Sequence, residues 1–166
     1  MPPLTTRGMS GEGMSYTSFE YGAKVVMRHL AKELDQEVTE VDGESSSMRS
    51  LSLREINSQI TEYYHRPHLA PPVLKLSVSV KNAGDLDGDE VVMLYVMPPP
   101  GMGAPQQNLR NYRRVHLRAG ESAIVEFDVT SHDLAFAHAD GKVRSAAGSW
   151  QIRVGSASSI ALHVAN

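Results

Sequence analysis

Residues 74–80 read Leu-Lys-Leu-Ser-Val-Ser-Val, a strict alternation of apolar and polar side chains. Successive side chains of a β-strand point to opposite faces, so this pattern predicts a strand with one buried and one solvated face. The same period of two recurs at 123–129, 150–154 and 160–164, and glycine-containing turns such as Asp140-Gly141 separate the runs. Short strands at this spacing predict an all-β protein, an antiparallel β-sandwich. The residues expected in its core are Leu76, Val78, Val92, Leu94, Val125, Phe127, Trp150 and Ile152.

The composition of the 166 residues is that of an ordinary globular domain, with 41% hydrophobic and 21% charged residues. The net charge of −3 gives no basic surface, and no apolar run is long enough to span a bilayer, so we expect neither nucleic acid nor membrane as a partner. The chain has no cysteine, which excludes disulfides and a thiol nucleophile. No secretory signal pattern occurs at the N-terminus, and the sequence leaves the compartment open.

The run 91–96, Val-Val-Met-Leu-Tyr-Val, differs from the other strands because both of its faces are apolar. A strand in a two-layer sandwich normally shows one face to water. We therefore expect another element to cover the face that carries Val91, Met93 and Tyr95. Two elements could do so, namely an extra segment of the chain itself or a neighbouring domain.

Residues 28–72 form such an extra segment. Residues 35–47 are acidic, rich in serine and poor in large apolar groups, which predicts a flexible loop. Residues 27–34 either extend the first strand or turn helical, and the pattern favours neither.

A helix is predicted over 52–64. Ser52-Leu53-Arg54-Glu55 is a capping box, and Leu53, Ile56 and Ile60 follow at helical spacing. The prolines at 67, 71 and 72 end the pattern. A helix of this length is not stable alone, so its apolar stripe must dock on the sandwich or lie across a partner.

Several residue types used in catalysis or metal binding occur, but not in patterns that predict a site. His65 and His68 are separated by a proline, and no cysteine could complete a zinc site. Residues 85–90 do not fit the spacing of a calcium-binding EF-hand loop and predict a polar hairpin turn instead. Ser131-His132-Asp133 are sequence neighbours, whereas catalytic triads assemble in space, so a turn cap is the better interpretation. We expect no catalytic residue, no metal site and no cofactor.

Four motifs occur in a fixed order along the chain. Residues 13–19 read Gly-Met-Ser-Tyr-Thr-Ser-Phe, 78–84 read Val-Ser-Val-Lys-Asn-Ala-Gly, 88–96 read Gly-Asp-Glu-Val-Val-Met-Leu-Tyr-Val, and 148–155 read Gly-Ser-Trp-Gln-Ile-Arg-Val-Gly. In this order they resemble the C-terminal fibronectin type III-like domain of glycoside hydrolase family 3, the β-glucosidases and β-xylosidases. The resemblance covers about 13–27 and 73–166.

The resemblance implies a fibronectin type III or immunoglobulin-like sandwich over 13–166, with a junction at 1–12. It also makes 28–72 an inserted loop-plus-helix segment between the first two strands. The implied function is that of a non-catalytic accessory domain in a glycosidase acting on β-linked glucosides or xylosides. No catalytic residue can be carried over, because the family's barrel and α/β domains do not occur in this chain.

The implied partners are the catalytic domains of the parent glycosidase, with a second subunit as a further one. In that arrangement Phe19 and Tyr21 enter the core. The alternative is a free-standing module that binds carbohydrate or protein. A sugar-binding face needs exposed flat aromatic rings, but Trp150 falls on the buried parity of its strand. The residues expected to pack against the neighbouring domain are Tyr16, Val91, Met93 and Tyr95.

Overall fold

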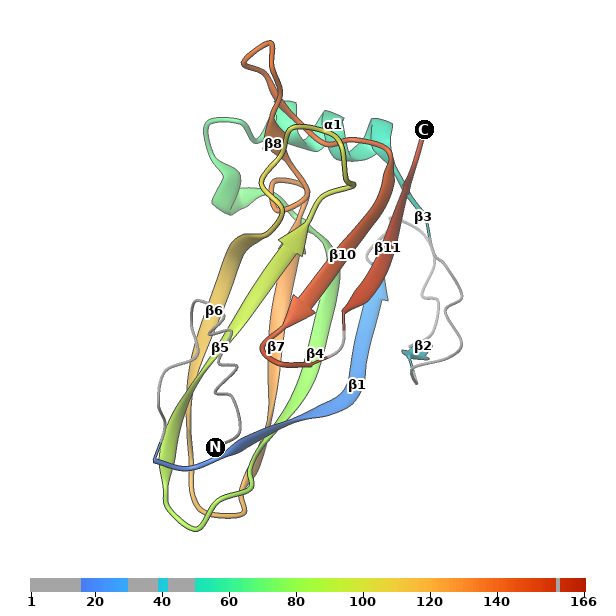
Figure 1. The fold of residues 1–166 in the computed structure, drawn as a ribbon. Coiled ribbons are helices and arrows are strands. Elements are labelled where there is room, and N and C mark those ends of the chain that lie inside the picture. Colours follow the sequence, from blue (N-terminus) through green and yellow to red (C-terminus); the bar gives the residue numbers. More distant parts are fainter. Residues whose placement is uncertain (1–15, 30–38, 42–49, 158) are drawn as a thin grey trace, which may run out of the picture.

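The protein is a β-sandwich in which two sheets pack face to face, as the computed structural model in Figure 1 shows. The structure describes residues 16–29, 39–41, 50–157 and 159–166, so the predicted junction at 1–12 lies outside the described residues. The four-stranded sheet has the order β2-β1-β4-β7, formed by Thr39–Val41, Phe19–His29, Pro72–Asn82 and Ser122–Thr130. The five-stranded sheet has the order β3-β11-β10-β5-β6, formed by Ser50–Ser52, Ile160–Ala165, Gly148–Val154, Gly88–Met97 and Asn108–Leu117.

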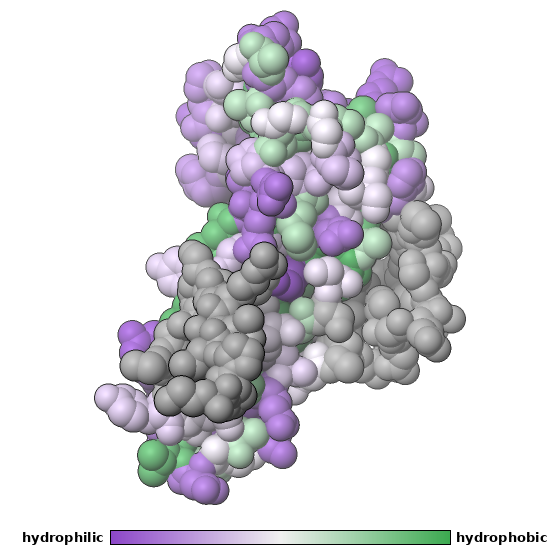
Figure 2. Space-filling model, in the orientation of Figure 1, coloured by the Kyte–Doolittle hydropathy of each residue, from purple (hydrophilic) through white to green (hydrophobic). Residues whose placement is uncertain are grey.

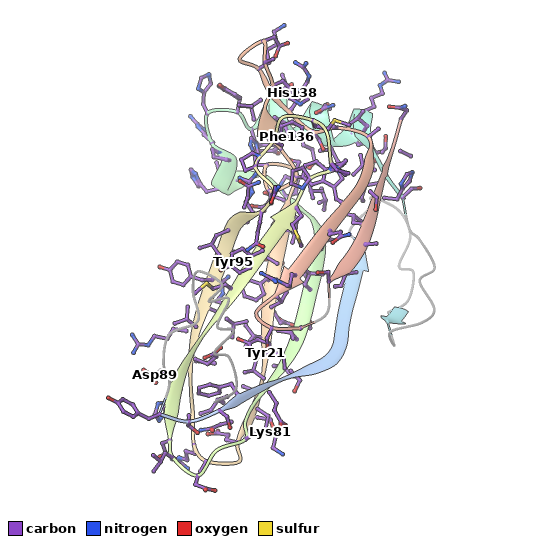
Figure 3. The ribbon with its side chains drawn as sticks, viewed as in Figure 1. Tyr21, Lys81, Asp89, Tyr95, Phe136 and His138 are labelled. Carbon is purple, nitrogen blue, oxygen red and sulfur yellow. The ribbon has the colours of Figure 1, made fainter. Side chains whose placement is uncertain are left out.

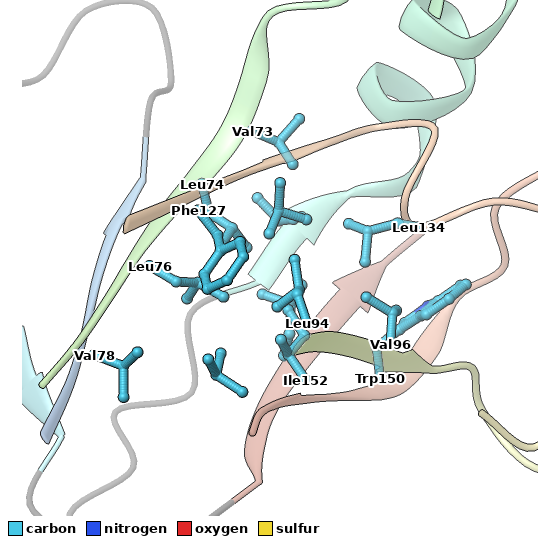
Figure 4. Close-up of a cluster of buried hydrophobic side chains, with 14 of the residues drawn as sticks. Val73, Leu74, Leu76, Val78, Leu94, Val96, Phe127, Leu134, Trp150 and Ile152 are labelled. Atoms are coloured by element: carbon cyan, nitrogen blue, oxygen red, sulfur yellow. The ribbon is translucent and has the colours of Figure 1, made fainter. Parts of the chain in front are cut away.

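The core lies between the two sheets, where the period-two pattern placed it. On β4 the even-numbered residues from Leu74 to Val80 are buried, whereas Lys75 is exposed and Ser77 and Ser79 are only partly buried. All eight residues that the sequence predicted for the core are buried, and Figure 4 shows many of them in one cluster with Leu134. The predicted all-β sandwich is therefore confirmed.

The turn predicted at 85–90 is not a hairpin. It joins β4 of the four-stranded sheet to β5 of the five-stranded sheet, so the prediction of a hairpin there was wrong. The connection at Ala119-Gly120 likewise crosses from β6 to β7. Turn residues show where the chain reverses direction, but they do not show which sheet receives the next strand.

The inserted segment contains more strand than the sequence predicted. Strand β1 runs on to His29, so residues 27–29 extend the first strand, and the rest of 27–34 lies outside the described residues. Strand β2 pairs antiparallel with β1. The flexible loop predicted at 35–47 was therefore wrong at Thr39–Val41, and the rest of that range lies outside the described residues. Strand β3 pairs parallel with β11, the one departure from antiparallel pairing among the described strands.

Helix α1 (Leu53–Glu62) begins at the predicted cap, where the Ser52 hydroxyl accepts a hydrogen bond from the Glu55 amide at 3.5 Å. Ile56 and Ile60 are buried and belong to the same cluster as the sandwich core. The helix lies across one end of the sandwich (Figure 1), close to the short hairpin of β8 (Phe136–Ala137) and β9 (Val143–Arg144). Of the two alternatives left open, docking on the sandwich or lying across a partner, the structure shows docking on the sandwich. A 3-10 turn, Pro67–Leu69, follows before β4.

Candidate interdomain surface

Strand β5 presents apolar side chains on both of its faces, as its sequence predicted. Val92, Leu94 and Val96 point into the sandwich and are buried. Val91 is 39% exposed on the outer face, and Met93 and Tyr95 are half-buried there. The sequence predicted that another element would cover the apolar outer face of β5. Helix α1 contacts β3 and β9 at the end of the sandwich, so it is not that element.

Two further residues join this face from the neighbouring strand β6. Tyr112 lies opposite Met93 and is 63% exposed, and Leu109 lies opposite Tyr95 and is 52% exposed. We call the five residues Val91, Met93, Tyr95, Leu109 and Tyr112 the apolar strip. Figure 2 shows green and pale residues interspersed with hydrophilic ones over this face of the molecule.

The sequence alone could not place Leu109 and Tyr112 together. They are three residues apart, which puts them on opposite faces of a regular strand. The pairing of β5 with β6 shifts between Leu94 and Tyr95, whose partners are Asn111 and Leu109, so β6 carries one extra residue there. A β-bulge of this kind changes the parity of the strand and turns both side chains outward.

Charged groups border the apolar strip. Asp89 Oδ2 accepts from Arg114 Nε at 3.0 Å, and Asp89 Oδ1 lies 2.7 Å from His116 Nδ1. The hydrogen bond with His116 and that with Arg114 lower the pKa of the Asp89 carboxyl below its usual range. The Arg153 guanidinium lies 5.2 Å from the centre of the Tyr95 ring, a cation–π arrangement. Figure 3 shows Asp89 nearer the end where β1 begins and Tyr95 farther along the sheet.

The outer face of the four-stranded sheet has a different character. Lys75 Nζ lies 3.3 Å from Asp128 Oδ1, and the Ser77 hydroxyl donates to Glu126 Oε1 at 3.3 Å. Ile124, 66% exposed, is the large apolar residue on that face of β7. Among the strand side chains whose burial the structure describes, the five-stranded sheet carries three exposed large apolar residues, Val91, Leu109 and Tyr112, and the four-stranded sheet carries one, Ile124.

Tyr16, which was expected to pack against a neighbouring domain, lies three residues before β1 begins. It is 97% exposed. Phe19 and Tyr21 pack against the core but remain partly buried, so they line its edge rather than its interior.

The Ser131-His132-Asp133 motif has a structural role. Asp133 Oδ2 accepts from the Thr130 amide at 2.8 Å and from the Thr130 hydroxyl at 2.9 Å, the predicted turn cap. Burial lowers the pKa of His132 in the same turn. Among the described residues, no group of three or more His, Asp or Glu could hold a metal ion. No helix in the described part is long and apolar enough to cross a membrane.

Residues 90–158 match the family of fibronectin type III-like domains. A probable β-glucosidase M of Aspergillus niger is 31% identical over 156 residues, which cover 93% of this chain and 18% of the relative. A probable β-D-xylosidase 6 of Arabidopsis thaliana is 30% identical over 118 residues, 67% of this chain and 14% of the relative.

Among solved structures, this chain also resembles parts of glucosidases. A β-glucosidase from Erythrobacter marinus superposes with a TM-score of 0.62 at 27% identity, over 93% of this chain and 16% of that one. A β-D-glucoside glucohydrolase from Trichoderma reesei superposes with a TM-score of 0.62 at 25% identity, over 93% of this chain and 20% of that one.

Fold and family match together define a fibronectin type III-like β-sandwich. The chain is the fibronectin type III-like domain that occurs in β-glucosidases and β-xylosidases of glycoside hydrolase family 3. It spans 14–18% of the length of the curated relatives described above.

Proposed function

We propose that this chain is the accessory domain of a longer glycosidase and that its apolar strip, with Tyr16, packs against the catalytic portion of that enzyme. The substrates proposed for the parent are β-linked glucosides or xylosides, as the names of the relatives suggest. The observation that carries the packing proposal is the exposure of Leu109 and Tyr112 beside Val91 on the outer face of a sheet. Contiguous apolar surface of this kind marks protein contacts. A second subunit is the other partner that could cover the strip.

We also propose that the chain by itself hydrolyses no glycoside. A glycosidase needs two carboxyl groups that flank the sugar and are free to act as acid and as base or nucleophile. Asp89 is engaged by Arg114 and His116, and Asp133 caps the turn at Thr130. Purified chain should not release nitrophenol from nitrophenyl glucosides or xylosides. Turnover that disappears when one of the chain's own carboxylates is replaced would refute this.

The packing proposal is tested first in the gene and then in the protein. The coding region in frame with this chain should encode a barrel domain of a glycosidase. In that longer protein, Tyr112→Lys should shorten the half-life of activity on heating, because it places a charge in the apolar contact. The matched control is Ile124→Lys, an equally exposed apolar position on the other sheet.

The isolated chain supplies the second comparison. Tyr112→Lys should change its free energy of unfolding by no more than about 0.5 kcal/mol, as is usual for exposed positions. Equal effects of Tyr112→Lys and Ile124→Lys on the longer protein would refute packing through the apolar strip. A large loss of stability in the isolated chain would show that Tyr112 supports the sandwich itself.

A further inference from the structure

Asn82 links the segment just before β1 to the β4–β5 connection and to the end of β6, where the β6–β7 connection begins. Its side chain is buried, and Oδ1 accepts from the Thr17 hydroxyl at 2.7 Å and from the Gly84 amide at 3.1 Å. Its Nδ2 donates to the carbonyls of Leu86 at 2.8 Å and Leu117 at 3.0 Å. The amide thus uses its oxygen twice and both of its hydrogens, and any loss would leave a buried polar group without a partner.

Tyr21 makes a second link, this time from one sheet to the other. Tyr21 lies on β1 of the four-stranded sheet, and its hydroxyl donates to Glu90 Oε1 on β5 of the five-stranded sheet at 2.6 Å. Burial, then the hydrogen bond and charge of Glu90, raise the pKa of Tyr21 well above its ordinary value, so the hydroxyl stays protonated and remains a donor. Figure 3 shows Tyr21 at the lower half of the sandwich, on the side of β1.

Glycines make room for these side chains. A Cβ on Gly84 would collide with the Thr17 hydroxyl, and a Cβ on Gly88 would come within 2.6 Å of the Thr17 methyl group. Gly155, at a φ of +53°, lies against the Tyr21 ring, which a Cβ at that position would strike. The close approach therefore depends on three positions without a side chain.

We propose that Thr17, Asn82, Tyr21 and Glu90 form a latch that holds residues 17–21 rigidly on the sandwich. The latch fixes where Tyr16 projects relative to the apolar strip, so Thr17, Asn82, Tyr21 and Glu90 act as positioning residues. Glu90 immediately precedes Val91 on β5, so the same link fixes the start of that strip. The contact of Tyr16 with a catalytic portion rests on the proposed function. The latch itself is a property of this chain and can be measured in it.

Hydrogen exchange on the isolated chain tests the latch. The Ala83 amide, which donates to the Ser18 carbonyl at 2.8 Å, and the amides of 18–21 are the reporters. Tyr21→Phe removes a hydrogen bond to a charged group and should speed their exchange by about tenfold or more. Thr17→Val should act in the same direction. Tyr112→Phe is the matched control and should leave these rates unchanged.

Distance measurements between spin labels give a second readout. The chain has no cysteine, so Tyr16→Cys and Ile124→Cys, both at exposed positions, provide two unique labelling sites. We expect a narrow distribution of distances that broadens when Thr17→Val or Tyr21→Phe is added. A broad distribution in the starting protein, or exchange rates that neither variant changes, would overturn the latch. Equal effects of Tyr112→Lys and Ile124→Lys in the longer enzyme would refute the proposed packing. That result would not change the exchange rates or label distances measured in the isolated chain, so the two proposals can fail separately.

Discussion

Replacing Ile60 by Ala should detach helix α1 from the sandwich or destabilise both. Ile60 is almost completely buried, and its side chain belongs to the same cluster as the residues between the sheets. A helix of ten residues is marginal in water without such packing. The side chains that α1 contributes to the core therefore help to hold the inserted segment, together with the pairing of β2 with β1 and of β3 with β11.

The size of the effect follows from burial and packing. Full burial of an isoleucine side chain contributes about 1.5–3 kcal/mol, and an unfilled cavity adds to the loss, so the expected total is about 2–5 kcal/mol. Alanine is the better helix former, but that preference is worth at most about 0.7 kcal/mol. The packing loss is several times larger, so the variant should be less stable.

Two assays report on the change. Trp150 is the single tryptophan, is 1% exposed and lies 6.0 Å from Phe136 between ring centres, so its fluorescence reports on the end of the sandwich near α1. Urea titration of Ile60→Ala should show a lower free energy of unfolding, and hydrogen exchange over α1 should accelerate. The control is Ile124→Ala, the same substitution at an exposed position, which should change stability by less than about 0.5 kcal/mol. If both variants lose the same stability, α1 does not depend on Ile60 for docking.

Three further outcomes can be measured in the same titration. Phe127→Ala should lower the free energy of unfolding by about 3–5 kcal/mol, and a loss below about 1 kcal/mol would place Phe127 outside the core. Gly155→Ala should destabilise more than Gly141→Ala, because both glycines have positive φ values but only Gly155 lies against the Tyr21 ring; equal losses would contradict this contact. Burial lowers the pKa of His132, so the folded protein binds this proton less tightly than the unfolded chain. The stabilising contribution is complete above the ordinary value of 6.5 and is lost as the pH falls toward the lowered folded-state pKa, so the wild type should lose more stability on acidification than His132→Gln. Identical pH dependence in the two proteins would show that His132 is not responsible.

The sequence alone determined the faces of the strands and the start of the helix. Strand parity is a local property, because each backbone step turns the side chain to the other face, so the alternation over 74–80 identified Leu76 and Val78 as core residues. The capping box is local as well, since Ser52 and Glu55 are three residues apart. The apolar outer face of β5 was also visible, because both parities of one short run are apolar.

Only the tertiary structure decided which surfaces these elements meet. The stripe of Ile56 and Ile60 required an apolar partner, but apolar attraction has no direction, so docking at the end of the sandwich could not be told from docking on β5. The turns after β4 and β6 gave no sign that they cross between sheets, because that choice depends on all the strands together. The apolar strip gained Leu109 and Tyr112 through a bulge, a break in the very periodicity from which strand faces are predicted.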